Sequence, residues 1–217
     1  MIFSWRRSRL WRDPERADAT GLVAIGGDLS PERLLEAYRR GIFPWYDEGL
    51  PICWWSPDPR AIFELDRFHV SRRLQRTCRS GQFQVSIDQA FSEVIRGCAD
   101  RPGQGTWITS EMVDAYETLH RLGHAHSIEV WKDNRLAGGI YGVAVGGLFA
   151  GESMFSRCTD ASKVALVHLV DRLRERGFQL FDIQFLNAHT DRLGAVEIPR
   201  MEYLARLRDA LDCRPTF

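Results

Sequence analysis

The feature that most constrains the fold is an apolar stretch at residues 138–155, GGIYGVAVGGLFAGESMF, which six glycines interrupt. A glycine inside a strand costs roughly 0.5–1 kcal/mol relative to alanine, so several together require a reason. The usual reasons are tight turns, bulges or a ligand that approaches the backbone closely. Glu152 is the acidic residue of the stretch. We therefore interpret the stretch as strands that line an apolar pocket, with one carboxylate at its rim and room at the glycines for a ligand.

The composition of the 217 residues excludes some classes of protein. Acidic and basic residues balance at 29 each, so the net charge gives no argument for binding nucleic acid, and such an argument must be local. Five cysteines without a CxxC pair indicate reduced thiols rather than a disulfide framework or a zinc site. The sequence begins without the apolar segment of a signal peptide and contains no run of 18 uncharged apolar residues. We expect a cytoplasmic protein with no membrane segment.

The order of secondary-structure signals predicts a mixed α/β fold in two unequal parts. An irregular lead-in over the first twenty residues precedes a helix that starts at Ser30, and a segment rich in proline and tryptophan follows at residues 41–60. Next come a short helix near residue 71, a strand, helices from Asp88 and Thr109, and three antiparallel strands. A helix that begins after Asp160, a strand and a last helix near Pro199 complete the pattern. We expect a small N-terminal α/β domain at residues 1–58 and a larger domain at 59–217.

The densest basic cluster lies on the predicted helix near residue 71. Its four arginines occur where no acidic residue interleaves in the sequence, and three of them share one helix face at spacings of four and three residues. A charge run is usually a solvated face, and a contact with a phosphate backbone is the alternative. The cluster consists of Arg72, Arg73, Arg76 and Arg79.

Two polar residues interrupt the late strand FQLFDIQFL. Asp182 and Gln184 are two residues apart, which predicts that both lie on one face of the strand. If the sheet is covered on both faces, they are either satisfied, for example by an ion pair with an arginine, or functional. With Glu152 they form a set of two carboxylates and an amide. Because no nucleophile elbow, P-loop or GxGxxG unit is present, this set favours acyl-group transfer between two bound substrates without a covalent enzyme intermediate.

Long sequence strings resemble a known family. GGDLSPERLLEAYRRGIFPW, WWSPDPR, TWIT, LGHAHSIEVW, GGIYGV, LFAGESMFSR, ASK and IPR occur between about Gly21 and Leu207 in the order and spacing of leucyl/phenylalanyl-tRNA–protein transferases. The resemblance implies an aminoacyltransferase that moves leucine or phenylalanine from aminoacyl-tRNA to the N-terminal arginine or lysine of a protein. The product then enters N-end rule degradation. It also implies an acetyltransferase-like (GNAT-like) second domain, and neither a cofactor nor a metal is expected.

The resemblance also assigns roles to residues. Trp45 and Trp107 correspond to the aromatic residues around the 3′-terminal adenosine, where stacking of a base is worth about 1–3 kcal/mol. Asp182, Gln184 and Glu152 form the expected catalytic set. The four arginines become candidate contacts to the tRNA backbone. The expected wall of the side-chain pocket consists of Ile140, Phe149, Met154, Leu166 and Leu169.

The expected reaction is aminolysis of an ester by an α-amine, and several alternatives stay open. The family often has methionine where this chain has Ile140, so the preference among leucine, phenylalanine and methionine is not settled by the sequence. Asp182 either orients the amine and stabilises its developing charge or removes its proton, while Gln184 positions amine or ester and Glu152 holds polar groups of the aminoacyl end. We expect a monomer that binds no membrane.

Two other functions fit parts of the pattern. A coenzyme A-dependent N-acetyltransferase would hold a diphosphate on a glycine-rich loop before a helix. The corresponding junction here, SRCTDASK, contains no glycine and includes Asp160, which disfavours a diphosphate. A non-catalytic RNA-binding module would leave Glu152, Asp182 and Gln184 unexplained, and the sequence contains no RNP or KH motif.

Overall fold

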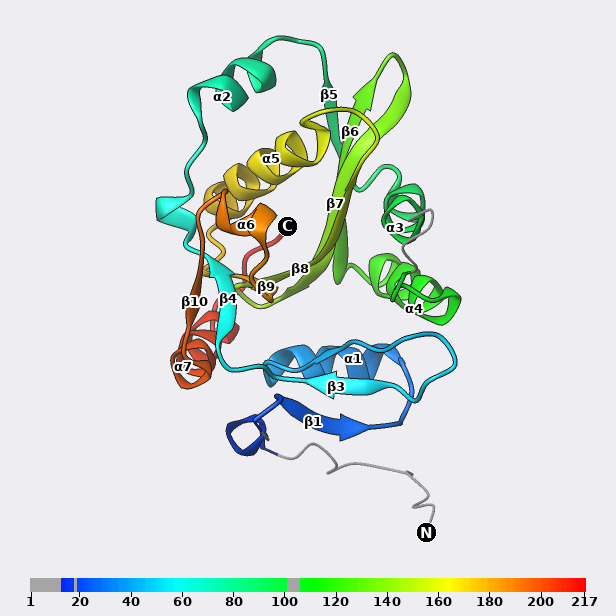
Figure 1. Cartoon of the computed structure of the whole chain (residues 1–217), viewed down its shortest axis with the longest axis vertical. Helices are drawn as coiled ribbons and strands as arrows, with labels where there is room; N and C mark the ends of the chain where they lie inside the picture. Colours follow the sequence, from blue (N-terminus) through cyan, green and yellow to red (C-terminus); the bar gives the residue numbers. More distant parts are fainter. Residues whose placement is uncertain (1–12, 18, 101–105) are drawn as a thin grey trace.

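A computed structural model describes residues 13–17, 19–100 and 106–217 of the chain (Figure 1). Most of the lead-in expected over the first twenty residues lies outside these ranges, as does part of the loop before Trp107. The described residues form two sheets of unequal size with helices packed around them (Figure 1).

The smaller sheet lies at the N-terminal end of the molecule, below the larger sheet in Figure 1. Its strand order is β1-β3-β2, with antiparallel pairing throughout. Helix α1 packs against β2 of this sheet. Helix α1 begins at Pro31 with Ser30 as its N-cap residue, as the sequence predicts, although the Ser30 side chain makes no capping hydrogen bond. The elements of this part are the 3-10 turn η1 (Pro14–Arg16), β1 (Leu22–Ile25), α1 (Pro31–Arg39), β2 (Phe43–Pro44) and β3 (Cys53–Trp55).

The larger sheet has seven strands in the order β10-β4-β9-β8-β7-β6-β5. Two tight turns join its central hairpins, one at Asp133-Asn134, where both residues have positive φ, and one at Gly146-Gly147. The three antiparallel strands expected from the sequence are therefore present. The strands are β4 (Arg60–Phe63), β5 (Gln84–Ile87), β6 (Ala125–Lys132), β7 (Arg135–Val145), β8 (Leu148–Ser156), β9 (Leu180–Gln184) and β10 (Ala195–Ile198).

Helices cover both faces of the larger sheet. In Figure 1, α5 lies on one side of β6 and β7 and α3 on the other, so apolar side chains form a cluster on each face. Helix α2 packs on α5, and α7 contacts β8 and β9. The helical elements are η2 (Leu65–Arg67), α2 (Arg72–Arg79), α3 (Phe91–Ala99), α4 (Ser110–Arg121), α5 (Ala161–Arg176), α6 (Ala188–Asp191) and α7 (Arg200–Leu211).

The order of the elements in the larger sheet confirms the mixed α/β class. Most neighbouring strands are antiparallel, but β8 and β9 run parallel with α5 as the crossover. Their pairing covers the register from Leu148↔Leu180 to Ala150↔Asp182, and beyond it the two strands diverge. This divergence places an opening in the middle of the sheet.

Several local expectations need correction. The helix expected from Asp88 begins at Phe91, because Asp88 adopts a φ of 57° and its side chain accepts hydrogen bonds instead from Ser127 and His126. Asp160 precedes α5 but makes no capping hydrogen bond with its side chain. Strand β10 and the short helix α6 were not predicted, because four residues of each give too little periodicity to detect.

The glycines of residues 138–155 serve the protein's own packing. A Cβ on Gly142 would lie 2.5 Å from the Phe149 ring and 2.3 Å from the carbonyl oxygen of Ala150. A Cβ on Gly138 would lie 2.8 Å from Ala161 of α5, and one on Gly151 would lie 2.9 Å from the Phe181 ring. The expectation that these glycines leave room for a ligand is therefore wrong at Gly138 and Gly142. Of these three glycines, only Gly151 also lines the pocket described next.

Candidate functional site

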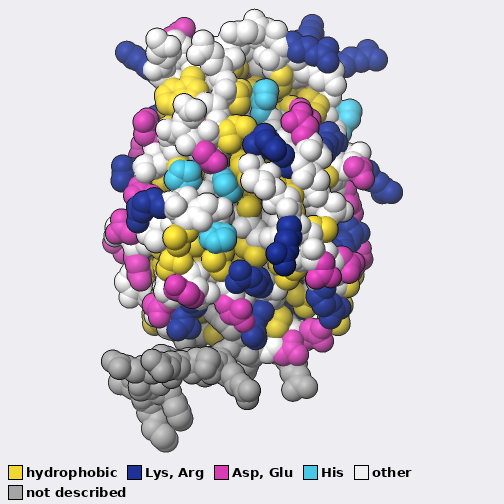
Figure 2. Space-filling view, turned by 180° about the vertical axis from the view of Figure 1, so that it is seen from behind, with side chains coloured by type: hydrophobic (Ala, Val, Ile, Leu, Met, Phe, Trp, Pro, Cys, Tyr) yellow, Lys and Arg dark blue, Asp and Glu magenta, His cyan; other side chains and the backbone are white. Residues whose placement is uncertain are grey.

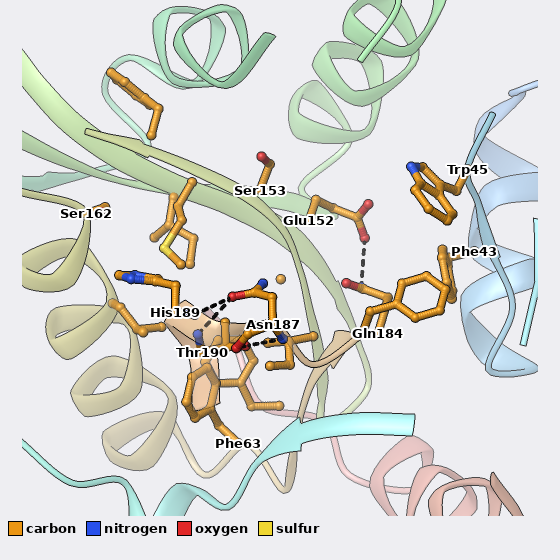
Figure 3. Close-up of a pocket in the computed structure, with 18 of the residues that line it drawn as sticks. Phe43, Trp45, Phe63, Glu152, Ser153, Ser162, Gln184, Asn187, His189 and Thr190 are labelled. Carbon is orange, nitrogen blue, oxygen red and sulfur yellow. Dashed lines mark hydrogen bonds between the residues drawn. The ribbon is translucent and has the colours of Figure 1, made fainter. Parts of the chain in front are cut away.

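A pocket of about 530 Å³ lies where β8 and β9 diverge, and we call it the central pocket (Figure 3). It receives side chains from both sheets: β2 of the small sheet forms one edge, and β8 and β9 of the large sheet line it. Helices α5 and α6 form the side opposite β2. Its lining comprises Phe43, Pro44, Trp45, Phe63, Trp107, Ile140, Gly151, Glu152, Ser153, Met154, Phe155, Ser156, Ser162, Leu166, Phe181, Ile183, Gln184, Phe185, Asn187, His189 and Thr190.

Glu152 reaches the pocket from a bulge in β8. In the pairing of β7 with β8, Tyr141 is opposite Ser153 and Gly142 is opposite Gly151, so Glu152 is the extra residue of the β8 strand. A bulge of this kind re-aims one side chain and bends the strand. Here it turns the carboxylate toward the opening between β8 and β9 (Figure 3).

A second bulge lies opposite the first, in β9. The register with β4 runs from Phe63↔Phe181 and Ile62↔Asp182 directly to Ala61↔Gln184, so Ile183 is the extra residue. Gln184 has a φ of 59°, which is uncommon for a residue with a side chain. The expectation that Asp182 and Gln184 share one face is therefore wrong. Gln184 lines the central pocket and Asp182 does not.

Two buried tyrosines hold the carboxylate of Glu152. Tyr38 of α1 donates a hydrogen bond to Oε1 at 2.8 Å, and Tyr116 of α4 donates to Oε2 at 3.2 Å. The two phenol oxygens are themselves 2.6 Å apart. Burial raises the pKa of Glu152 to about 7, although the hydrogen bonds from the tyrosines act in the opposite direction. Glu152 therefore changes its charge near neutral pH.

The amide of Gln184 lies against Glu152. In one orientation Nε2 is 3.5 Å from Glu152 Oε1 and donates to it (Figure 3). In the flipped orientation Nε2 donates to the carbonyl oxygens of Gly151 and Ile183, at 3.0 Å each. The first orientation suits an ionised Glu152, whereas the second turns the amide oxygen toward it and suits the protonated acid.

Asp182 lies behind the pocket wall in a buried ion pair with Arg60. Nε of Arg60 is 2.8 Å from Oδ1 and Nη2 is 2.6 Å from Oδ2. Tyr203 donates to Oδ2 at 3.0 Å, and the backbone N–H of Gln184 donates to Oδ1 at 2.9 Å. Both partners of the pair are 1% exposed, so Asp182 is fully satisfied away from the pocket. The sequence offered an ion pair with an arginine as the alternative to a functional role, and this pair exists.

The apolar end of the pocket contains part of the expected wall. Ile140, Met154 and Leu166 line it, whereas Phe149 and Leu169 are buried behind the lining. Phe181 and Phe63 complete this end, and their rings are 5.4 Å apart. The alternation of apolar residues in the late strand is the signal that could have identified Phe181.

The mouth of the pocket is aromatic. Trp45 is 44% exposed (Figure 3), and its ring centroid lies 5.3 Å from that of Phe185, which is 40% exposed. Trp107 lines the pocket from the loop before α4. Large exposed aromatic rings beside a pocket are unusual in a monomer and offer a stacking surface. Phe185 was not among the expected site residues, and its place in a strand gave no signal that it would be exposed.

A polar edge formed by α6 was also missed by the sequence. Asn187 caps α6 by accepting hydrogen bonds from the backbone N–H groups of His189 and Thr190, at 2.9 and 3.0 Å. All three residues line the central pocket, opposite Glu152 (Figure 3). Burial lowers the pKa of His189, with the nearby Lys163 acting in the same direction.

The arginine cluster lies on α2 and is separate from the pocket lining. Its four side chains are exposed, and Figure 2 shows Lys and Arg side chains at the upper right, where α2 lies after the half-turn from Figure 1. Arg73 forms an ion pair with Asp160 at 2.7 Å, and Lys163 contacts the same carboxylate at 2.8 Å. No acidic residue interleaves with the arginines along α2, but Arg73 finds a partner in Asp160, which is distant in sequence.

Neither a membrane-spanning helix nor a metal cluster occurs in residues 13–17, 19–100 and 106–217. No helix there combines the length and apolar character that crossing a membrane requires. No group of three or more His, Cys, Asp or Glu side chains within those residues is arranged to hold a metal ion.

Solved structures give a likeness of low TM-score. A ribosomal-protein-alanine N-acetyltransferase from Brucella melitensis biovar Abortus 2308 matches at a TM-score of 0.38 and 17% identity, covering 50% of this chain and 83% of that chain. A likeness this distant does not identify an activity.

Sequence comparisons are specific. The family model described as leucyl/phenylalanyl-tRNA protein transferase matches residues 62–208, and the model of its N-terminal domain matches residues 27–58. A leucyl/phenylalanyl-tRNA–protein transferase from Anaeromyxobacter sp. (strain K) is 57% identical, over 99% of this chain and 93% of that protein. One from Klebsiella pneumoniae (strain 342) is 55% identical, over 92% and 86%. The chain therefore belongs to the leucyl/phenylalanyl-tRNA protein transferase family and is a transferase.

Proposed function

We propose that the protein moves leucine or phenylalanine from aminoacyl-tRNA to the N-terminal arginine or lysine of acceptor proteins, in the cytoplasm and as a monomer. The product would feed N-end rule degradation. One observation carries the proposal: a single pocket combines an apolar end, a carboxylate with a pKa of about 7, and an exposed aromatic mouth. Family membership supports the same activity.

We expect the aminoacyl end of the tRNA to lie along the pocket, from its aromatic mouth to its apolar end. Its side chain would lie among Ile140, Met154 and Leu166, and its terminal adenine would stack near Trp45 and Trp107. Leucine and phenylalanine are unbranched at Cβ, so a narrow apolar end admits them and disfavours isoleucine and valine. Discrimination by one methylene is worth about 1–3 kcal/mol, so the selectivity is moderate.

Glu152 is the group best placed to handle protons. The neutral α-amine attacks the ester carbonyl, a C–N bond forms, the C–O3′ bond breaks, and one amine proton must finally reach O3′. A carboxylate with a pKa of about 7 can accept this proton and return it to O3′ near neutral pH. The tyrosines orient the carboxylate, and Gln184 would position the amine or the ester beside it.

Asp182 acts through Gln184 in this proposal. Its Oδ1 accepts from the backbone N–H of Gln184, and its charge is neutralised by Arg60. It would therefore hold the bulge of β9 in place rather than touch the amine. This role replaces both roles considered from the sequence.

The exposed arginines of α2 are our candidates for contact with the tRNA backbone. Arg73 shares Asp160 with Lys163, whereas Arg72, Arg76 and Arg79 form no ion pair with an acidic side chain of the described residues. Arginine binds phosphate oxygens in a two-point geometry. We also propose a division into domains at residues 1–58 and 59–217, which the separate small sheet and the separate family model for residues 27–58 support.

A transfer assay tests the proposal. The purified protein is mixed with leucyl-tRNA labelled in leucine and with two peptides that differ in their first residue, arginine or alanine. We expect label on the arginine peptide only. Absence of transfer to both peptides, with intact leucyl-tRNA recovered, would contradict the proposed activity, and equal transfer to both would contradict the proposed acceptor.

A further inference from the structure

A column of aromatic rings extends from the apolar end of the central pocket into the protein. Phe181 lines the pocket, and its ring centroid is 5.8 Å from that of Phe149. Phe149 is stacked in turn on Phe217, with centroids 5.3 Å apart and planes at 21°. Phe217 also stacks on His126, at 4.3 Å and 20°. Phe217 is therefore two rings removed from the pocket.

The rings in this column have few directions in which to move. Phe149 meets the edges of Phe178 and Phe181, at 6.3 and 5.8 Å, and its ring lies against Gly142, where no side chain could fit. Phe217 covers a face of the Phe149 ring. Phe149 is 1% exposed, so neighbouring side chains surround its ring. The ring could therefore move only into the space that Phe217 now occupies.

Phe217 itself is held on several sides. The guanidinium of Arg172 lies 5.8 Å from its ring centroid, the Phe178 ring meets it at 79°, and His126 is fixed by a 2.7 Å hydrogen bond to Asp88. These contacts come from α5, from the segment between α5 and β9, and from β6. The ring therefore packs against the apolar cluster that also contains Phe149, Phe178 and Phe181.

We propose that Phe217 is a positioning residue that sets the depth of the apolar end of the pocket by fixing Phe149 and, through it, Phe181. It thereby tunes the preference between leucine and phenylalanine. The inference rests on the proposed function for its substrates but concerns a residue outside the pocket lining.

The consequence of removing the ring follows from packing. Phe217 is half-buried, so Phe217→Ala opens a space beside the buried ring of Phe149. A core relaxes only partly into such a space. Phe149 and Phe181 can then withdraw from the pocket, which deepens it. A deeper apolar end gains contact with a phenyl group and loses contact with the shorter leucine side chain.

The experiment compares kcat/KM for phenylalanyl-tRNA and leucyl-tRNA in four proteins. They are the wild type, Phe217→Ala, Phe217→Leu and the control Ile95→Ala. Ile95 is fully buried on α3 in the cluster on the other face of the sheet, so its truncation destabilises the protein away from the aromatic column. We expect the ratio of kcat/KM for phenylalanyl-tRNA to that for leucyl-tRNA to rise about threefold or more in Phe217→Ala. A single methylene in an apolar pocket already changes discrimination by about 1 kcal/mol or more, which exceeds a threefold effect. We expect a smaller rise in Phe217→Leu and no change in Ile95→Ala.

A binding measurement separates this inference from the proposed activity. Leucyl- and phenylalanyl-3′-amino-adenosine, in which an amide replaces the ester, are titrated calorimetrically against wild type and Phe217→Ala. A binding ratio that moves toward phenylalanine in the variant supports the inference even where the transfer assay fails. Unchanged ratios in both assays, with a lowered Tm as in Ile95→Ala, would overturn it and leave Phe217 as ordinary packing.

Discussion

Arg60 and Asp182 form a two-point ion pair that links the start of β4 to β9 beneath the wall of the central pocket. The guanidinium also donates to the carbonyl of Gly41 at 3.1 Å and lies over the rings of Phe43 and Tyr203. The pair therefore joins the small sheet, the large sheet and α7. It sits where a catalytic carboxylate was expected from the sequence.

Removing one partner of the pair should lower the free energy of unfolding strongly, whereas replacing both partners with apolar side chains should lower it much less. Removing one partner leaves a buried charge uncompensated, so Arg60→Met should lower the free energy of unfolding by about 3–5 kcal/mol. The double variant Arg60→Met, Asp182→Leu should recover much of this loss, because no charge is then buried. Urea denaturation of the wild type, both single variants and the double variant measures the coupling. A double variant as unstable as the sum of the singles would contradict it.

Asp182→Asn tests the role of this residue in the reaction. Because Asp182 supports Gln184 and does not line the pocket, the substitution should lower kcat by displacing Gln184 but leave the shape of the pH–rate profile unchanged. The profile is measured with leucyl-tRNA and an arginine peptide at saturating peptide. Loss of a titration limb in the variant would instead make Asp182 the proton acceptor.

The difference between expectation and structure at this site has a physical origin. Period-2 alternation predicted the strand through Asp182 correctly, and long periodic segments such as α5 were equally clear. A single extra residue at Ile183 moved Gln184 to the other face, and sequence alternation carries no signal of such a bulge. The partners Arg60 and Tyr203 are distant in sequence from Asp182, so only the folded chain identifies them.

The glycines show the same limit. Their number correctly indicated close approaches, but not what approaches, because alanine, valine and phenylalanine side chains of the protein occupy the space. The resemblance supplied Trp45 and Trp107, which the structure places at the pocket, whereas it gave no reason to consider Asn187 or Phe185.

Gly142→Ala should disturb the aromatic column behind the pocket. Its Cβ would lie 2.3 Å from a backbone oxygen of β8 and 2.5 Å from Phe149, so either strand or ring must shift. Overpacking of this kind costs about 1–3 kcal/mol. Gly81→Ala is the comparison, since its Cβ meets open space and only the positive φ is strained. In thermal unfolding, the Tm of Gly142→Ala should lie well below that of Gly81→Ala. The reverse order would refute the packing role of Gly142.

The arginines of α2 should contribute to tRNA affinity in a salt-dependent way. Arg76→Ala should weaken binding and reduce the slope of log K against log salt by about 0.7–0.9, as expected for one lost phosphate contact. Arg73→Ala should have a smaller effect, because its guanidinium is already paired with Asp160. Arg208→Ala on α7 serves as the control, since this residue is 68% exposed and lies away from α2 (Figure 1). Filter binding at several salt concentrations measures the slopes, and equal slopes for Arg76→Ala and Arg208→Ala would exclude the cluster from the interface.

Glu152→Gln should increase the free energy of unfolding relative to the wild type as the pH rises, and it should lower the transfer rate. The pKa of Glu152 is raised from an ordinary value of 4.5 to about 7, so the folded state binds a proton more tightly than the unfolded chain. The stability that this proton contributes is fully present below about pH 4.5 and is lost as the pH rises through about 7. The loss is a few kcal/mol at most, because each pH unit between the two pKa values is worth about 1.36 kcal/mol.

Glutamine carries no charge at any pH, so Glu152→Gln should lack this loss, and its stability relative to the wild type should increase between pH 5 and pH 8. Its transfer rate should fall, and the ascending limb near pH 7 should disappear from the pH–rate profile, leaving only the titration of the α-amine. Denaturant unfolding at both pH values and kcat from pH 5.5 to pH 9 provide the two measurements. A variant that keeps the limb near pH 7 would show that another group accepts the proton.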